Sequence, residues 1–166
     1  MLSGRSTPLI LAGVDPLASL YRTVNSYPHL LPIGITVSPD DIKDDELARL
    51  TVPALDAAHN EQIRKAKELF ENCSGQGRTA TDLTDVARAA TFGAVELLFA
   101  DIDEVIPGTI DQSGVVTLAG AASARTYGVV DEIAARVLAS GGRVMAIRRA
   151  DISCSSGLAA ILRYAT

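Results

Sequence analysis

Between residues 81 and 104 the spacing of apolar side chains changes from that of a helix to that of a buried strand. Four apolar residues recur at positions i, i+3, i+4 and i+7 and so share one helical face: Leu83, Val86, Ala87 and Ala90. Gly93 follows at the point where the chain must turn. Residues 94–100 are apolar except for Glu96, which is typical of a strand covered on both faces. A helix joined this directly to a buried strand indicates a layered α/β domain.

The neighbouring segments extend this pattern. Thr81 precedes the helix and is its expected N-cap, with acidic Asp82 and Asp85 in the first turn. Further along the chain we expect a hairpin turning at residues 111–114 and an amphipathic helix with Val130, Ile133, Ala134, Val137 and Leu138 inward. The hairpin, the helix and two final strands are predicted at residues 104–118, 126–142, 143–147 and 158–164.

The N-terminal part has a different organisation. Residues 44–73 predict a long helix that Pro53 divides or kinks, because proline cannot donate a backbone hydrogen bond. Before it, residues 8–13, 15–27 and 29–41 read as a strand, a helix and an extended segment. These first 43 residues are too few to form a core of their own. We therefore expect an α/β/α sandwich with a mixed sheet of about four or five strands over residues 44–166, preceded by a strand-helix-strand remnant at 1–43.

Composition and charge narrow the function classes. The chain of 166 residues is 48% hydrophobic and carries a net charge of −5, which disfavours general binding to nucleic acid. It has no apolar run of the length that spans a membrane. Cys73 and Cys154 stand far apart without a CxxC spacing, as suits a reducing compartment, so we expect a cytoplasmic protein.

Three acidic residues, Asp101, Asp103 and Glu104, follow the end of the strand predicted at 94–100. Ligands often bind at that edge of α/β sheets, and carboxylates bind cations. The cluster is either a solvated loop or the centre of a small metal-dependent hydrolase. Neither His29 nor His59 has a partner at the spacing of a metal site, and the glycines match no nucleotide-binding motif, so no cofactor is predicted.

Residues 120–166 reverse the overall charge, with six arginines against three acidic residues. Four of the arginines follow or flank the last two predicted strands: Arg143, Arg148, Arg149 and Arg163. They are candidates for contacting ribosomal RNA or the acidic face of a protein partner. The alternative is that they keep the ends of buried strands soluble.

Three motifs in order resemble one known family. They are Gly93-Ala94-Val95-Glu96 before an apolar strand, the helix and Gly-Gly-strand of residues 131–147, and the ending at residues 157–164, GLAAILRY. Over residues 45–166 the chain resembles the C-terminal domain of the archaeal and eukaryotic class-1 peptide-chain release factors and their bacterial relatives. The resemblance implies a fold shared with kink-turn-binding ribosomal proteins, and it implies that residues 1–43 correspond to the end of the family's central RNase-H-like domain.

The resemblance also bears on activity and partners. The family's hydrolytic Gly-Gly-Gln loop lies in the central domain, and Gly75-Gln76-Gly77 of this chain is not that motif. We therefore expect a non-catalytic domain that binds the ribosome or a translational GTPase in termination or ribosome rescue. An RNA-binding module of the kink-turn-reader type is the alternative.

The N-terminal remnant carries an apolar face that needs a cover, formed by Leu9, Ile10, Leu11, Leu17, Leu20, Leu30 and Leu31. Self-association through this face, giving a homodimer, is the expected cover.

Overall fold

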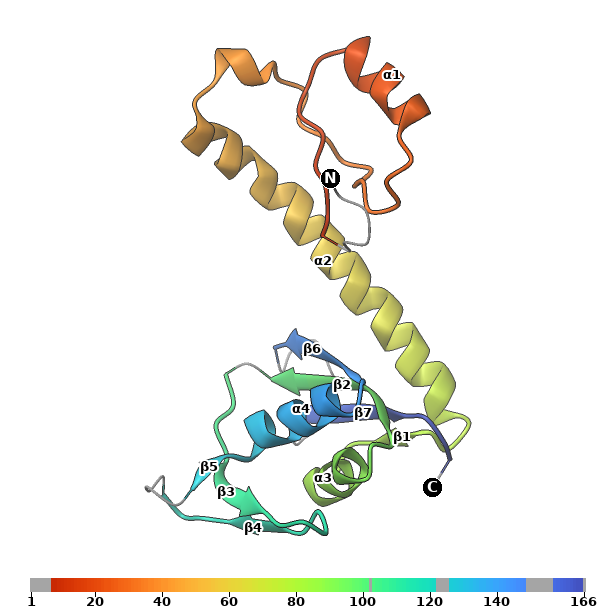
Figure 1. Ribbon diagram of the computed structural model, residues 1–166, viewed down its shortest axis with the longest axis vertical. Coiled ribbons are helices and arrows are strands. Elements are labelled where there is room, and N and C mark those ends of the chain that lie inside the picture. Colours follow the sequence, from red (N-terminus) through yellow and green to blue (C-terminus); the bar gives the residue numbers. More distant parts are fainter. Residues whose placement is uncertain (1–6, 102, 122–125, 149–156, 166) are drawn as a thin grey trace. The chain divides into compact units, whose positions relative to one another are not determined.

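The computed structural model describes residues 7–101, 103–121, 126–148 and 157–165, and the chain divides into two compact units, Met1–Gln62 and Ile63–Thr166 (Figure 1). The long helix α2 (Asp44–Ser74) contributes residues to both units. In the described part of the chain, no helix combines the length and the apolar character that a membrane crossing requires.

The C-terminal unit is built on a four-stranded mixed sheet in the order β1-β7-β2-β6. The strands are β1 (Thr79–Ala80), β2 (Val95–Asp101), β6 (Arg143–Ile147) and β7 (Leu158–Leu162). The strand β2 pairs in parallel with β6 and antiparallel with β7, which in turn pairs antiparallel with β1. The predicted mixed sheet is therefore confirmed, with four strands.

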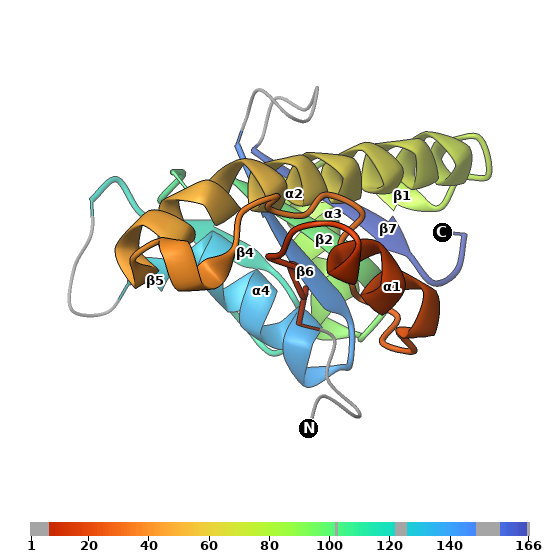
Figure 2. The same cartoon turned by 90° about the horizontal axis from the view of Figure 1, so that it is seen from above.

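Helices cover both faces of this sheet. Alternation along the strands sends Leu98 and Ala160 to one face, where they pack with α3 (Leu83–Thr91) and α4 (Val129–Ala139). Phe99 and Ile161 point to the other face and pack with Ile63, Ala66 and Cys73 of α2. Figure 2 shows the yellow-green end of α2 alongside β1 and β7. The predicted α/β/α layering is confirmed.

The C-terminal unit also contains a three-stranded sheet, in the order β4-β3-β5. Its strands are β3 (Pro107–Ile110), β4 (Val116–Leu118) and β5 (Tyr127–Gly128), of which β3 and β4 form the predicted hairpin. Gly114 in the hairpin turn has φ +82°, and a Cβ there would lie 2.8 Å from the Cα of Arg88 in α3. The turn therefore needs a residue without a side chain.

One local prediction was wrong. Asp82, not Thr81, caps α3, because its carboxylate accepts hydrogen bonds from the backbone N–H groups of Thr84 and Asp85 at 2.8 and 3.3 Å. Of the two effects predicted for Pro53, the division does not occur, because helix α2 runs through this residue. Pro53 is exposed, so water can bind the carbonyl that proline leaves without its helical donor.

The N-terminal unit contains α1 (Leu17–Val24), the short 3-10 helix η1 (Pro39–Asp41) and the first part of α2. Its extended segments meet in two parallel bridges, Leu9 with Leu30 and Ala12 with Ile35, and α1 connects them (Figure 1). Of the 24 buried hydrophobic residues in the described chain, this unit holds Ile35 and Ala54 and the C-terminal unit holds the rest. The core of the protein is thus the core of the C-terminal unit.

Candidate partner-binding surface

The three sequence motifs meet at one end of the four-stranded sheet, and Arg163 joins them. Its backbone N–H donates to the carbonyl of Ala94 at 2.8 Å. Its guanidinium donates to the carbonyl of Val95 at 3.2 Å and to that of Ser140, after α4, at 3.0 Å. Charge-assisted hydrogen bonds of this kind are the stronger ones in proteins. The arginine of the C-terminal motif therefore fixes the start of β2 against the end of α4.

Close backbone packing completes this junction. A Cβ at Gly142 would lie 2.8 Å from the carbonyl oxygen of Val95 and 2.7 Å from a methyl of Val137. A Cβ at Gly93, where φ is +67°, would lie 3.4 Å from the Cβ of Ser140. Glycine is required at both positions, for space at Gly142 and for the left-handed backbone at Gly93.

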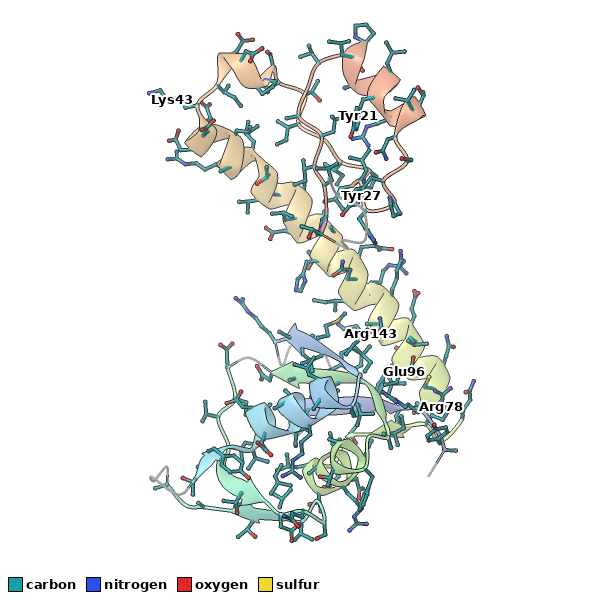
Figure 3. All side chains as sticks on the ribbon, in the orientation of Figure 1. Tyr21, Tyr27, Lys43, Arg78, Glu96 and Arg143 are labelled. Carbon is teal, nitrogen blue, oxygen red and sulfur yellow. The ribbon has the colours of Figure 1, made fainter. Side chains whose placement is uncertain are left out.

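Glu96 of the first motif has a structural partner at the same end. The register of β2 against β7 shifts between Val95 and Leu97, which leaves Glu96 as the extra residue of a bulge. Its carboxylate accepts a hydrogen bond from Arg78 at 3.1 Å, and the Arg78 guanidinium also donates to the carbonyl of Leu162 at 2.8 Å. Figure 3 labels Arg78, Glu96 and Arg143 at this end of the sheet.

Large apolar side chains are exposed around this junction. Phe92 at the end of α3, Leu138 near the end of α4 and Tyr164 after β7 are 70%, 59% and 71% exposed. Arg143, exposed at the start of β6, lies opposite Leu97 of β2. We call Phe92, Leu138 and Tyr164 the sheet-end surface. Aromatic residues are among the types enriched in protein interfaces.

A groove continues this surface along α3. It has a volume of about 490 Å³ and lies between α3 and the edge strand β1, with Phe92, Ala94 and Leu162 at one end and Asp82, Asp85 and Arg88 along its side. The exposed Phe92 therefore belongs to both features.

The sequence alone did not single out the apolar members of the sheet-end surface. Leu138 was expected to face inward, and this prediction was wrong because the inward stripe of α4 is Val129, Val130, Ile133 and Val137. Phe92 lies outside the inward stripe of α3. Its position off this stripe is the sequence feature from which its exposure could have been predicted. Tyr164 was assigned to the last strand, which ends at Leu162.

The four candidate arginines are not all at one place. Arg143 and Arg163 lie at the end of the sheet where β6 begins and β7 ends, whereas Arg148 follows the opposite end of β6, about 16 Å away at the rise of an extended strand. Arg163 is occupied by the carbonyls it binds. Arg149 lies outside the described residues. The two ends of β6 therefore belong to different surfaces.

The candidate acidic residues lie where β2 ends, at the far side of the sheet from Tyr164. Asp101 is buried and its carboxylate accepts a hydrogen bond from the backbone N–H of Asp103 at 3.1 Å. The Glu104 carboxylate lies against Gly157, where a Cβ would overlap it. Within the described ranges, no three side chains of the histidine, cysteine, aspartate or glutamate types are grouped so that they would hold a metal ion.

Comparison with known proteins identifies the family. The model of bacterial archaeo-eukaryotic release factor family 3 matches residues 1–93, more than half of the chain. The chain belongs to this family. The family resemblance is therefore confirmed by a match that covers the N-terminal unit and the C-terminal unit up to Gly93. A search of curated proteins found no match.

Two solved structures of similar fold are those of archaeal Pelota and of Dom34 from S. cerevisiae. Archaeal Pelota, in a model of ribosome-bound Pelota and ABCE1, is 20% identical and aligns with 95% of this chain and 43% of its own at a TM-score of 0.59. Dom34 of S. cerevisiae, a translation termination-like factor interacting with Hbs1, is 16% identical over 96% of this chain and 46% of its own, with a TM-score of 0.57. The release factor-like chain thus spans less than half the length of either protein.

A shorter structure matches over nearly its whole length. The C-terminal domain of a peptide chain release factor from Methanosarcina mazei is 16% identical and aligns with 75% of this chain and 98% of its own, at a TM-score of 0.54. At these identities the comparisons establish a shared fold.

Proposed function

We propose that this chain is a non-catalytic part of a release factor-like protein and docks on a protein partner at the ribosome through the sheet-end surface. The observation that carries the proposal is the exposed set Phe92, Leu138 and Tyr164 around the Arg163 junction. Phe92 and Tyr164 suit an interface because aromatic residues are enriched at interfaces, and Leu138 adds exposed apolar area.

The family relationship supports the setting of this interaction. Pelota is found bound to the ribosome with ABCE1, and Dom34 interacts with Hbs1. For this chain we propose a ribosome-associated partner of the translational GTPase kind, in termination or ribosome rescue.

The proposed domain assignment gives residues 1–43 to the end of a central domain and residues 44–166 to the C-terminal domain. The coverage of the solved structures supports it. The isolated C-terminal domain from M. mazei accounts for 75% of this chain, and the longer Pelota chain accounts for 95%. About one fifth of the chain thus finds its counterpart outside the isolated domain.

Co-sedimentation with ribosomes of the host tests this function, across a salt series from about 50 mM to about 200 mM. We expect the chain to pellet with ribosomes through the whole series, because the sheet-end surface is mainly apolar. Pelleting that falls steeply with salt would indicate phosphate contacts by arginines such as Arg148, and so the RNA-binding alternative. Absence of pelleting at every salt concentration would contradict ribosomal docking.

A further inference from the structure

The groove between α3 and β1 has the length of a short linear peptide. The residues that line it from the cap to the end of α3 share one face of the helix, and they are Asp82, Asp85, Arg88, Ala89 and Phe92. From Asp82 to Phe92 the chain rises about 15 Å along the helix axis. A polypeptide in extended conformation covers this length with about five residues.

The less exposed residues of the groove are small or apolar. Ala80 of β1, Ala89 of α3 and Ala94 before β2 are partly buried, and Leu162 at the end of β7 is fully buried. Small side chains let another chain approach closely. At the same end as Ala94 and Leu162, the ring of Phe92 is 70% exposed. This end of the groove therefore suits one apolar side chain of a bound segment.

The wall opposite α3 is the edge of a sheet. Strand β1 pairs with β7 on one side, through Thr79 with Ile161 and Ala80 with Ala160, and no further strand of the described residues pairs with its other side. Both residues of β1 line the groove. Successive residues of an antiparallel strand direct their N–H and C=O groups to opposite sides. One residue of β1 therefore directs these groups away from β7, where an added strand can pair with them.

The charges of the groove favour a basic side chain in the bound segment. Asp82 and Asp85 are exposed at the end away from Phe92, and Arg88 is the one basic residue of the lining. Among the described residues, neither Asp85 nor Arg88 has an ion-pair partner. The two carboxylates outnumber the guanidinium, so they attract lysine or arginine and repel phosphate. Arg88, between the two ends, can donate to backbone carbonyls of the segment.

We infer that the groove binds an extended segment of the protein partner that carries a basic and an apolar side chain. The basic side chain faces Asp82 and Asp85, the apolar one packs on Phe92 about four residues away, and the backbone between them pairs with β1. This inference rests on the proposed function, because Phe92 belongs to both the groove and the sheet-end surface. It adds the chemistry by which the partner is recognised.

Selection from phage-displayed random peptides of about nine residues tests the inference on the purified chain, without ribosomes. Asp85→Lys and Asp131→Lys are matched variants, because each removes an acidic residue from the first turn of a helix and only Asp85 lines the groove. The unmodified chain and Asp131→Lys should enrich peptides with a basic residue about four positions from an apolar one. Circular dichroism establishes that both variants are folded.

A synthetic copy of the enriched peptide then gives the affinity and the place of binding. By fluorescence anisotropy, Asp85→Lys should bind it at least about fivefold more weakly than the unmodified chain, and Asp131→Lys should bind it equally well. Amide NMR signals of residues 79–82 and 85–92 should shift on binding, and that of the exposed Leu118 should not.

The peptide assay and ribosome pelleting fail separately. Pelleting that depends on Leu138, without peptide binding that depends on Asp85, overturns this inference and leaves the proposed function standing. Peptide binding that depends on Asp85, without any pelleting, supports the groove and contradicts ribosomal docking.

Other outcomes also overturn the inference. These are enriched peptides that lack a basic residue, equal weakening by Asp85→Lys and Asp131→Lys, and NMR shifts that cluster outside the groove. Light scattering covers one more occupant, since a dimer that Asp85→Lys converts to monomer would place a second copy of the chain in the groove.

Discussion

At the scale of single residues, Arg163 explains why distant sequence motifs occur together. One side chain binds the carbonyl at the start of β2 and the carbonyl after α4, so the motifs around Val95, Ser140 and Arg163 depend on one another. An arginine in a sequence motif is often taken for a contact residue. Here the geometry shows that the arginine holds the junction, and its neighbour Tyr164 is the exposed one.

We predict that Arg163→Met lowers the free energy of unfolding by about 2 kcal/mol, because two carbonyls lose a charged donor. Arg163→Lys is expected to restore little of this, since an ammonium group lacks the planar fork that reaches both carbonyls. Arg143→Met, at the exposed start of β6, is the control and should change stability by less than about 0.5 kcal/mol. Equal effects of Arg163→Met and Arg143→Met in urea unfolding would contradict the assigned role.

Asp111 provides a prediction on pH. The hydroxyl of Ser113 and the backbone N–H of Val115 donate to its carboxylate and lower the pKa of Asp111 below its ordinary 3.8, while partial desolvation opposes them. Because the pKa is lower in the folded chain, the stabilisation is present above 3.8 and is lost as pH falls through the folded pKa.

Thermal unfolding followed across this acidic range checks the effect. The melting temperature of the unmodified chain should fall more steeply than that of Asp111→Asn, whose amide does not titrate. Parallel curves for the two proteins would show that the hairpin carboxylate does not contribute.

At the scale of elements, the parts that follow one local rule were predictable and the parts set by tertiary contacts were not. The helix ending at Gly93, the buried strand β2 and the hairpin turn each come from a local pattern, and all three are present. The short strands β1 and β5 have two residues each and carry no pattern of their own. They form because β1 pairs with the edge of β7 and β5 pairs with the edge of β3.

The sequence did not reveal the sheet-end surface, because the exposure of its residues also depends on tertiary contacts. Leu138 and Phe92 are apolar residues in or beside helices whose apolar residues mostly pack inward, and only the final orientation of α3 and α4 leaves them in solvent. The arginines were visible in the sequence, but the separation of Arg148 from Arg163 depends on strand direction, which the sequence left open.

The hairpin turn allows steric crowding to be separated from backbone strain. Gly114→Ala should be the most destabilising of three glycine substitutions, because φ is +82° and the new Cβ would meet the backbone of α3. Gly77→Ala should cost about 1 kcal/mol, since φ is +67° in open space. Gly120→Ala, with open space and no positive φ, should cost little. Chemical denaturation measures the order, and a Gly120→Ala effect as large as that of Gly114→Ala would contradict it.

At the scale of the whole molecule, the two units differ in what holds them together. The C-terminal unit carries nearly all of the buried apolar residues, whereas the N-terminal unit leaves the apolar residues of α1 in solvent. The apolar residues of the first 43 positions indicated a face that the unit leaves uncovered. The layered pattern of the later residues indicated where the core lies.

The central claim is that the sheet-end surface docks the chain on a ribosomal partner, and a matched pair of leucines tests it most directly. Leu138 and Leu118 are 59% and 61% exposed in the same unit, and only Leu138 lies in the sheet-end surface. In co-sedimentation with host ribosomes at about 200 mM salt, Leu138→Ser should reduce the pelleted fraction about fivefold, the loss expected from removing one interface anchor worth about 1 kcal/mol. Leu118→Ser should pellet like the unmodified chain. Equal pelleting of all three proteins would contradict the account.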